Sequence, residues 1–303
     1  MTLGFQALQQ TKITSGSKGE GLQLKGSDLD LMFMHRSFKV YESESDFFPQ
    51  SCKCIPLLMK TEDTHPCFTQ LHLVNNHDLQ YDLTGDHGKR IKNSFLGTKF
   101  SSELFRLNCM RGMPNTYGMT KIHGPCISTT TESMDAVFCL KCDKWISHAK
   151  QWTIRHRTTW PSSDLIFKII SCGVLFVPIG YKGSNNEILQ WRMSFSVAEK
   201  CLIFSFNHTQ LLCYALLKIM IKEIVQKQED LKSLLCSYFV KTLMFWMLEE
   251  SDPSIWRPDK IITCFMACLK RLIYCVEYST LLHYFIPDNN LFYLRFDFAK
   301  KTK

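Results

Sequence analysis

The sequence predicts an α+β protein with two lobes, a mixed β-sheet lobe followed by an all-helical C-terminal lobe. Up to about residue 200, short apolar runs are broken by Gly, Pro, Asn and Asp, which is typical of strands and loops. From about Ser196 onward, apolar residues recur at helical spacing instead. The length of 303 residues is enough for two lobes with separate cores. We therefore expect domains at residues 1–203 and 204–303.

Several segments carry the prediction for the first lobe. Strands are expected from Asp28 to Met34, around Ile122, and over residues 133–140. The apolar stretch 165–181 is interrupted by polar residues and by proline, so we expect a buried strand or helix pair and not a membrane span. Residues 75–120 are polar and irregular, and we expect loops there.

In the second lobe, helices are expected over residues 211–224, 231–248 and 259–278. Pro253, Pro258 and Pro287 separate and end these segments.

Composition narrows the class of protein. Hydrophobic residues make up 45% and charged residues 21% of the chain, which is ordinary for a globular protein, and 22 Phe exclude extensive disorder. The net charge of +8 permits a phosphate-rich partner without requiring one. The 14 cysteines are scattered, and residues 1–10 do not resemble a signal peptide. We expect reduced, mostly buried thiols and a cytoplasmic or nuclear location, with no transmembrane segment.

Two carboxylates near a glycine turn are the first candidate site. Asp28 and Asp30 occupy alternate positions at the start of an apolar run, so a strand would present both on one face. Such a pair favours Mg²⁺, with Mn²⁺ as the other candidate, and the turn at Gly16 can bring backbone N–H groups to a phosphate. The alternative is a polar strand start with ordinary turn residues. Asp135, inside a strand-like run, is a candidate third carboxylate or else a surface charge at a sheet edge.

Cysteines and basic residues form weaker candidate sites. Cys139 and Cys142 form a single Cys-x-x-Cys pair, which falls short of the four ligands of a structural zinc site. Residues 141–160 combine five Lys and Arg with three Trp, which is typical of anion or nucleic-acid contact or of a solvated structural segment. Lys241, in an apolar helix, is expected to extend to solvent, and Tyr238 is a candidate for stacking on a base.

Taken together, seven segments resemble the male-abnormal-21-like family, which includes the cyclic GMP–AMP synthase-like receptors. They occur in the family's order along nearly the whole chain and comprise Gly16–Gly21, Gly26–Leu31, Ile122–Pro125, Trp191–Lys200, Leu211–Tyr214, Cys236–Thr242 and Tyr284–Phe292.

The resemblance implies a nucleotidyltransferase lobe joined to a helical lobe of the HhH/H2TH-like kind, with nucleotides bound in the cleft between them. It implies that Asp28, Asp30 and Asp135 hold Mg²⁺ and carry the catalysis. It also implies that the triphosphate is contacted by Ser15, Gly16 and Ser17, and that the nucleobases are contacted by Arg192, Ser194, Ser196 and Glu199. In the helical lobe, it implies phosphate contacts from Lys218 and Ser237 and stacking of a base on Tyr238.

The family resemblance also implies a product, a cyclic dinucleotide made from ATP and GTP as a messenger in innate immune signalling. The sequence departs from the family at two points. It lacks the zinc-binding His/Cys insertion of the vertebrate DNA sensor, so no structural zinc is expected, and double-stranded RNA or another ligand on a basic surface is the expected activator. Only about fifteen residues precede the glycine turn, where the family has a long spine helix, so we expect that helix to be truncated.

Two alternatives stay open at this level. One is a catalytically inactive nucleotide- or RNA-binding regulator of the same fold. The other, less favoured by the resemblance, is a template-independent polymerase that adds nucleotides to RNA. The oligomeric state does not follow from the sequence.

Overall fold

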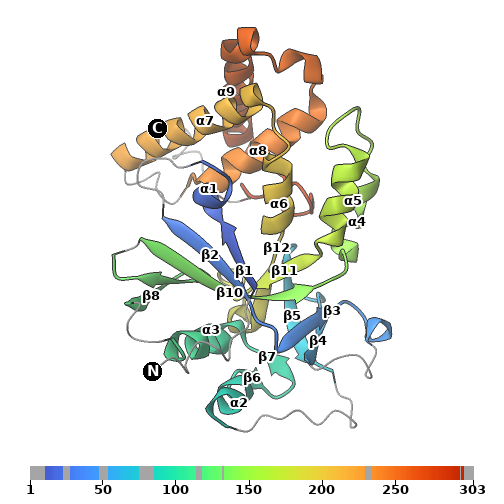
Figure 1. Ribbon diagram of the computed structural model, residues 1–303, viewed down its shortest axis with the longest axis vertical. Helices are drawn as coiled ribbons and strands as arrows, with labels where there is room; N and C mark the ends of the chain where they lie inside the picture. The colour runs from blue at the N-terminus through green and yellow to red at the C-terminus, as the bar shows by residue number, and fades with distance from the viewer. Residues whose placement is uncertain are drawn as a thin grey trace. The chain divides into compact units, whose positions relative to one another are not determined.

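The structure is a computed structural model of the 303-residue chain. It describes residues 11–22, 28–47, 54–74, 85–113, 118–131, 133–228, 234–293 and 295–296. Figure 1 shows the chain coloured from its N-terminus to its C-terminus.

The chain forms two compact units. The first, the sheet unit, consists of Met1–Ile146 and Ser171–Val197, and the second, the helical unit, of Ser147–Ile170 and Ala198–Lys303. The sequence predicted a single boundary at residue 203. The units are instead interleaved, because the segment Ser147–Ile170 packs with the C-terminal helices: Trp152, for example, lies 5.0 Å from Phe285 between ring centroids.

The sheet unit is built on one mixed β-sheet, as predicted (Figure 1). The main strand order is β1-β2-β10-β11-β12-β5-β4-β3, with β9 on β10, β8 on β9, β7 on β5 and β6 on β7. The pairs β2–β10 and β3–β4 are parallel, and the other pairs are antiparallel. The strands are β1 (Thr11–Ser15), β2 (Leu29–Met34), β3 (Phe38–Tyr41), β4 (Ile55–Lys60), β5 (Phe68–Leu73), β6 (Phe95–Leu96), β7 (Lys99–Phe100), β8 (Met119–His123), β9 (Cys126–Thr129), β10 (Met134–Cys142), β11 (Val174–Val177) and β12 (Gln190–Ser194).

The described helices up to residue 203 have at most ten residues, and the three that follow are longer, with 20, 14 and 17 residues. They are α1 (Gly16–Gly19), α2 (Gly85–Lys92), α3 (Ser102–Arg111), α4 (Lys150–Ile154), α5 (Ser163–Ser171), α6 (Ser196–Ile203), α7 (His208–Lys227), α8 (Ser237–Glu250) and α9 (Ile261–Glu277). Single 3₁₀ turns are η1 (Glu44–Asp46), η4 (Ser147–Ala149), η5 (Glu187–Leu189), η7 (Pro253–Ile255) and η8 (Pro258–Lys260). In the helical unit, α7, α8 and α9 pack pairwise against one another.

The predicted loop region 75–120 contains regular structure, so that prediction was wrong where the structure describes it. It holds α2, the β6–β7 hairpin and α3. Residues 75–84 and 114–117 lie outside the described part. The helix α3 buries Phe105, and its N-cap Ser101 accepts a hydrogen bond from the N–H of Leu104. A polar ten-residue helix with few buried residues has little hydrophobic periodicity, and this is why the sequence did not indicate it.

The apolar stretch 165–181 forms a helix and a strand, α5 and β11. Gly173 makes the turn between them with a φ of +68°, and a Cβ there would lie 2.2 Å from the carbonyl oxygen of Cys142. Only glycine fits this close approach.

Three further observations bear on the sequence predictions. None of the described helices combines the length and the apolar character needed to cross a bilayer. The described cysteines are free thiols, except that Cys54 is disulfide-bonded. The predicted helix over 231–248 begins at Ser237 in the structure, with residues 231–233 outside the described part.

Candidate functional site

Three carboxylates meet in the sheet unit, on two parallel strands. Asp30 on β2 lies directly opposite Asp135 on β10, and Asp28 precedes β2 by one residue. One carboxylate oxygen from each of the three lies within 4.8 Å of the other two, and all three residues are half-buried. Carboxylates this close repel one another unless a cation lies between them. Since Mg²⁺ and Mn²⁺ prefer oxygen ligands, the donor set fits the predicted metal.

The glycine turn lies against this acid cluster. Ser15, the last residue of β1, pairs with Asp30 in the sheet, so the Ser15–Ser17 turn begins beside the carboxylates. Gly16 has a φ of +63°, and a Cβ built on it would lie 1.7 Å from Oδ2 of Asp30. The backbone of the turn therefore approaches the Asp30 carboxylate more closely than any side chain would allow. The predicted phosphate contact and the predicted metal ligands are neighbours.

Three of the predicted base contacts lie on the same face of the sheet unit. Arg192 and Ser194 alternate along β12, so both point to one face. Ser194 pairs with Leu175, which clusters with Met32 and Val137, and these two residues lie two positions beyond Asp30 and Asp135 on the strands. The hydroxyl of Ser196 lies 3.1 Å from the sulfur of Met32.

Cys126 on β9 is a neighbour of the acid cluster that the sequence did not indicate. Burial raises the pKa of its thiol to about 12, with the negative charges of Asp135, Asp30 and Asp28 adding to the rise and Arg192 opposing it. A thiol with this pKa is protonated at neutral pH and therefore uncharged. The turn Gly124-Pro125, which precedes β9, was the one local indication of a hairpin at this point.

The predicted site residues of the helical unit have their own contacts. Glu199 on α6 is buried, and its Oε2 lies 3.1 Å from Nζ of Lys241 on α8. Lys241 also lies 5.9 Å from the ring centroid of Tyr238, so it does not extend to solvent as expected but joins two predicted site residues. Lys218 is buried on α7 with its Nζ 5.0 Å from the ring of Tyr214, whereas Ser237 is exposed at the start of α8.

The basic segment 141–160 makes mostly internal contacts. In the sheet unit, Lys141 pairs with Asp143 at 3.0 Å and Lys144 with Asp46 at 2.5 Å. In the helical unit, Arg155 and Arg157 both bind Glu249, as described below. These contacts favour the structural alternative for this segment over nucleic-acid binding.

Comparison with known proteins identifies both parts of the chain. Residues 118–205 match the family model "Mab-21 protein nucleotidyltransferase domain", and residues 210–302 match "Mab-21 protein HhH/H2TH-like domain". Together the two models match more than half of the chain. The acid cluster and the glycine turn described above lie partly before the first match, since Asp28, Asp30 and Gly16 precede residue 118.

Curated relatives carry two kinds of name. The chain is 30% identical to cyclic GMP-AMP synthase of Mus musculus over 130 residues, which are 38% of this chain and 25% of the relative. It is 27% identical to a cyclic GMP-AMP synthase-like receptor of Ctenocephalides felis, over 58% of this chain and 40% of the relative. Protein mab-21-like 3 of Danio rerio is 25% identical over 60% of this chain and 46% of the relative. The matches thus span between a quarter and just under half of these relatives.

The two consecutive domain matches, together with the mixed sheet and the helical C-terminal region of the structure, show that the chain belongs to the Mab-21 family of nucleotidyltransferases.

Proposed function

We propose that this protein is a divalent-metal-dependent nucleotidyltransferase that joins ATP and GTP into a cyclic dinucleotide. The observation that carries the proposal is the cluster of Asp28, Asp30 and Asp135 with the Gly16 turn packed directly against it. An acidic group alone is common on protein surfaces. A carboxylate cluster joined to a turn that exposes backbone N–H groups is the combination that a metal-bound triphosphate requires.

The reaction follows from the groups present. A ribose hydroxyl of one nucleotide attacks the α-phosphorus of the other; the new P–O bond forms as the bond to the β-phosphate breaks, and pyrophosphate leaves. In a second transfer, a ribose hydroxyl of the other nucleotide attacks the remaining α-phosphorus, which closes the ring and releases a second pyrophosphate. Asp28, Asp30 and Asp135 would hold Mg²⁺ or Mn²⁺, which when bound favours the deprotonated hydroxyl and offsets charge on the leaving group. A carboxylate of the cluster accepts the hydroxyl proton, and the Ser15–Ser17 turn orients the triphosphate.

We assign recognition of the nucleobases to residues that lie on the same face of the sheet as the acid cluster. Arg192, exposed in the middle of β12, offers guanidinium donors for a base edge, and the hydroxyls of Ser194 and Ser196 both donate and accept. The roles implied for Glu199, Lys218, Ser237 and Tyr238 stay predictions. We place the protein in the cytoplasm or nucleus, in innate immune signalling, on the resemblance to the synthases alone.

The test is product formation. The protein is incubated with ATP, GTP and Mg²⁺ or Mn²⁺, with and without double-stranded RNAs of several lengths, and the products are separated by chromatography. We expect a cyclic dinucleotide from the native protein and at least a hundredfold less from Asp30→Asn and Asp135→Asn, because each change removes a charge from the metal site. Asp164→Asn, an exposed residue on α5, is the matched control and keeps full activity.

Two results would contradict the proposal. A product made equally well by Asp30→Asn places the chemistry elsewhere. Nucleotide binding that is unchanged by EDTA, with no product under any activator, identifies the catalytically inactive regulator instead.

A further inference from the structure

The helical unit has a pocket that is separate from the predicted site residues. It has a volume of about 150 Å³ and lies between α8, α9 and the segment 280–282. Its walls include Leu243 and Trp246 from α8 and Leu281 from the segment, with the exposed ion pair of Glu250 and Arg271 also lining it. A cavity of this size accommodates a single aromatic ring, and an open mouth permits a larger ring system to extend outward.

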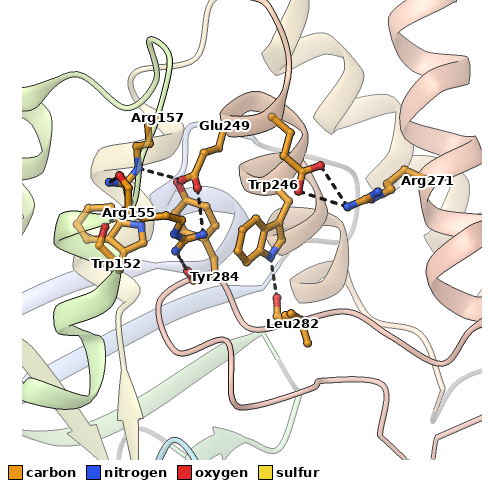
Figure 2. A network of polar contacts seen from close by, with 9 residues as sticks. Trp152, Arg155, Arg157, Trp246, Glu249, Arg271, Leu282 and Tyr284 are labelled. Atoms are coloured by element: carbon orange, nitrogen blue, oxygen red, sulfur yellow. Dashed lines mark hydrogen bonds and ion pairs between the residues drawn. The ribbon is translucent and has the colours of Figure 1, made fainter.

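Trp246 is held in a fixed orientation at this pocket. Its indole N–H donates to the carbonyl oxygen of Leu282 at 2.8 Å, and the guanidinium carbon of Arg155 lies 4.4 Å from its ring. Figure 2 shows Trp246 between Arg155 on one side and Arg271 on the other. An indole fixed in this way offers a flat surface for stacking without a loss of side-chain freedom on binding.

A donor and an acceptor lie side by side at the same pocket. Both carboxylate oxygens of Glu250 lie 3.2–3.3 Å from one nitrogen of Arg271, Nη2. No other hydrogen bond of Arg271 occurs within the described residues, so its remaining N–H groups can serve a ligand. Because the pair is exposed, its mutual attraction is weak, and a ligand can share both groups at little cost.

We propose that this pocket binds a guanine base stacked on Trp246. The N1–H and N2–H groups of guanine donate to the two oxygens of Glu250, and O6 accepts from Arg271. Uracil offers only one N–H beside a carbonyl, and adenine has no ring N–H on that edge, so the order of affinity is guanosine, uridine, adenosine. The base comes from a free nucleoside or nucleotide or from a single-stranded RNA. This site lies outside the proposed nucleotidyl transfer and does not depend on it.

The experiment measures nucleoside binding to the full chain by ligand-observed NMR in the presence of EDTA. Guanosine is used as the probe because it lacks phosphates and cannot exploit a metal-bound triphosphate site. We expect Glu250→Gln to weaken guanosine binding about tenfold and to remove the preference over adenosine, since a charge-assisted pair of hydrogen bonds is lost. Glu223→Gln, an exposed residue on α7, is the matched control and leaves the affinity unchanged.

Further measurements with an RNA trinucleotide, with two variants and with adenosine distinguish the possible results. A guanine-containing RNA trinucleotide that binds at least tenfold more tightly than guanosine identifies RNA as the source, and equal affinities identify the free nucleoside; both support the pocket. Guanosine binding that survives Glu250→Gln but is lost in Asp30→Asn overturns the pocket and leaves the proposed function intact. Absence of guanosine binding at millimolar concentration, or equal affinity for adenosine, also overturns it.

Discussion

At the residue scale, the acid cluster and the turn at Gly16 depend on each other, because the turn packs against the carboxylate of Asp30. Gly16 is needed for two separate reasons, its positive φ and the contact with Asp30. Gly21 has a positive φ as well, +81°, but a Cβ there would meet nothing within 4 Å. Substitutions at Gly16 and Gly21 therefore distinguish the free-energy cost of a positive φ, which is present at both positions, from the cost of the contact with Asp30, which is present only at Gly16.

We expect Gly21→Ala to lower the free energy of unfolding by about 1 kcal/mol, which is the cost of a positive φ for a residue with a Cβ. Gly16→Ala should cost more and should also weaken Mn²⁺ binding, because its Cβ displaces the Asp30 carboxylate. Urea unfolding gives the stabilities, and Mn²⁺ titration followed by electron paramagnetic resonance gives the affinities. Equal effects of the two substitutions on Mn²⁺ binding would show that the turn does not position Asp30.

A network of ion pairs and hydrogen bonds lies in the helical unit, around Glu249 (Figure 2). Its carboxylate binds Arg155 and Arg157, each at 3.0 Å, and accepts a hydrogen bond from Tyr284 at 2.5 Å. Burial, reinforced by the negative charge of Glu249, raises the pKa of the Tyr284 hydroxyl, so this group stays protonated and donates. Trp152 contributes its backbone carbonyl, which accepts from Arg157.

Adjacent glutamates allow a matched test of this network. Glu249→Ala leaves the guanidinium groups of Arg155 and Arg157, whose side chains are 20% and 5% exposed, without their carboxylate and should cost about 3–5 kcal/mol. Glu250→Ala removes only an exposed partner of Arg271 and should cost at most about 1 kcal/mol. Both are measured by urea unfolding, and equal costs would mean that the Glu249 network is as weak as a surface ion pair.

At the element scale, hydrogen bonds between elements fix short helices that have little propensity of their own. The hydroxyl of Ser101 caps α3 by accepting from Leu104 N at 3.3 Å, and it donates to the carbonyl of Ile188 in η5 at 2.8 Å. Ser162 caps α5 in the same way from an exposed position, with its hydroxyl 3.3 Å from Leu165 N. A buried cap with two partners should contribute more than an exposed cap with one.

We expect Ser101→Ala to cost about 1–2 kcal/mol, because the capping bond is lost and the Ile188 carbonyl keeps only the hydroxyl of Ser102, at 3.2 Å, of its two serine donors. Ser162→Ala should cost about half as much, since water can replace the hydroxyl. Thermal unfolding followed by circular dichroism measures both. A smaller effect for Ser101→Ala than for Ser162→Ala would contradict the argument.

At the scale of the whole molecule, the helical unit takes up a segment from the middle of the chain. Ser147–Ile170 carries Arg155 and Arg157, which are the partners of Glu249 on α8. A C-terminal fragment that begins at Ala198, or at the sequence-based boundary of residue 204, therefore contains a buried acid without its two cations.

We expect a fragment of residues 198–303 to unfold with low cooperativity, and a synthetic peptide of residues 147–170 to restore a cooperative transition. The peptide with Arg155→Ala and Arg157→Ala is the control and should fail to do so. Urea unfolding followed by circular dichroism is the measurement. A fragment that unfolds cooperatively without the peptide would show that the helical unit does not need the inserted segment.

Local pattern was enough to predict the strongest features of this fold. The apolar run after Asp28 formed β2, the run around Asp135 formed β10, and the helical periodicity over residues 211–224 lies within α7. These segments have long or regular apolar patterns, which depend only on neighbouring residues. The helices within 75–120 escaped prediction because their burial comes from partners far along the chain, such as Ile188 for Ser101.

By itself, the sequence determined the residue types and the strands that carry the acid cluster, because a charge that opens or interrupts an apolar run is visible locally. The tertiary structure decided that Asp30 and Asp135 are opposite each other, since parallel pairing of β2 with β10 joins positions about a hundred residues apart. It also determined which carboxylate Arg155 and Arg157 bind. Their charge suggested a surface for a partner, whereas burial requires a counter-ion, and Glu249 on a distant helix supplies it.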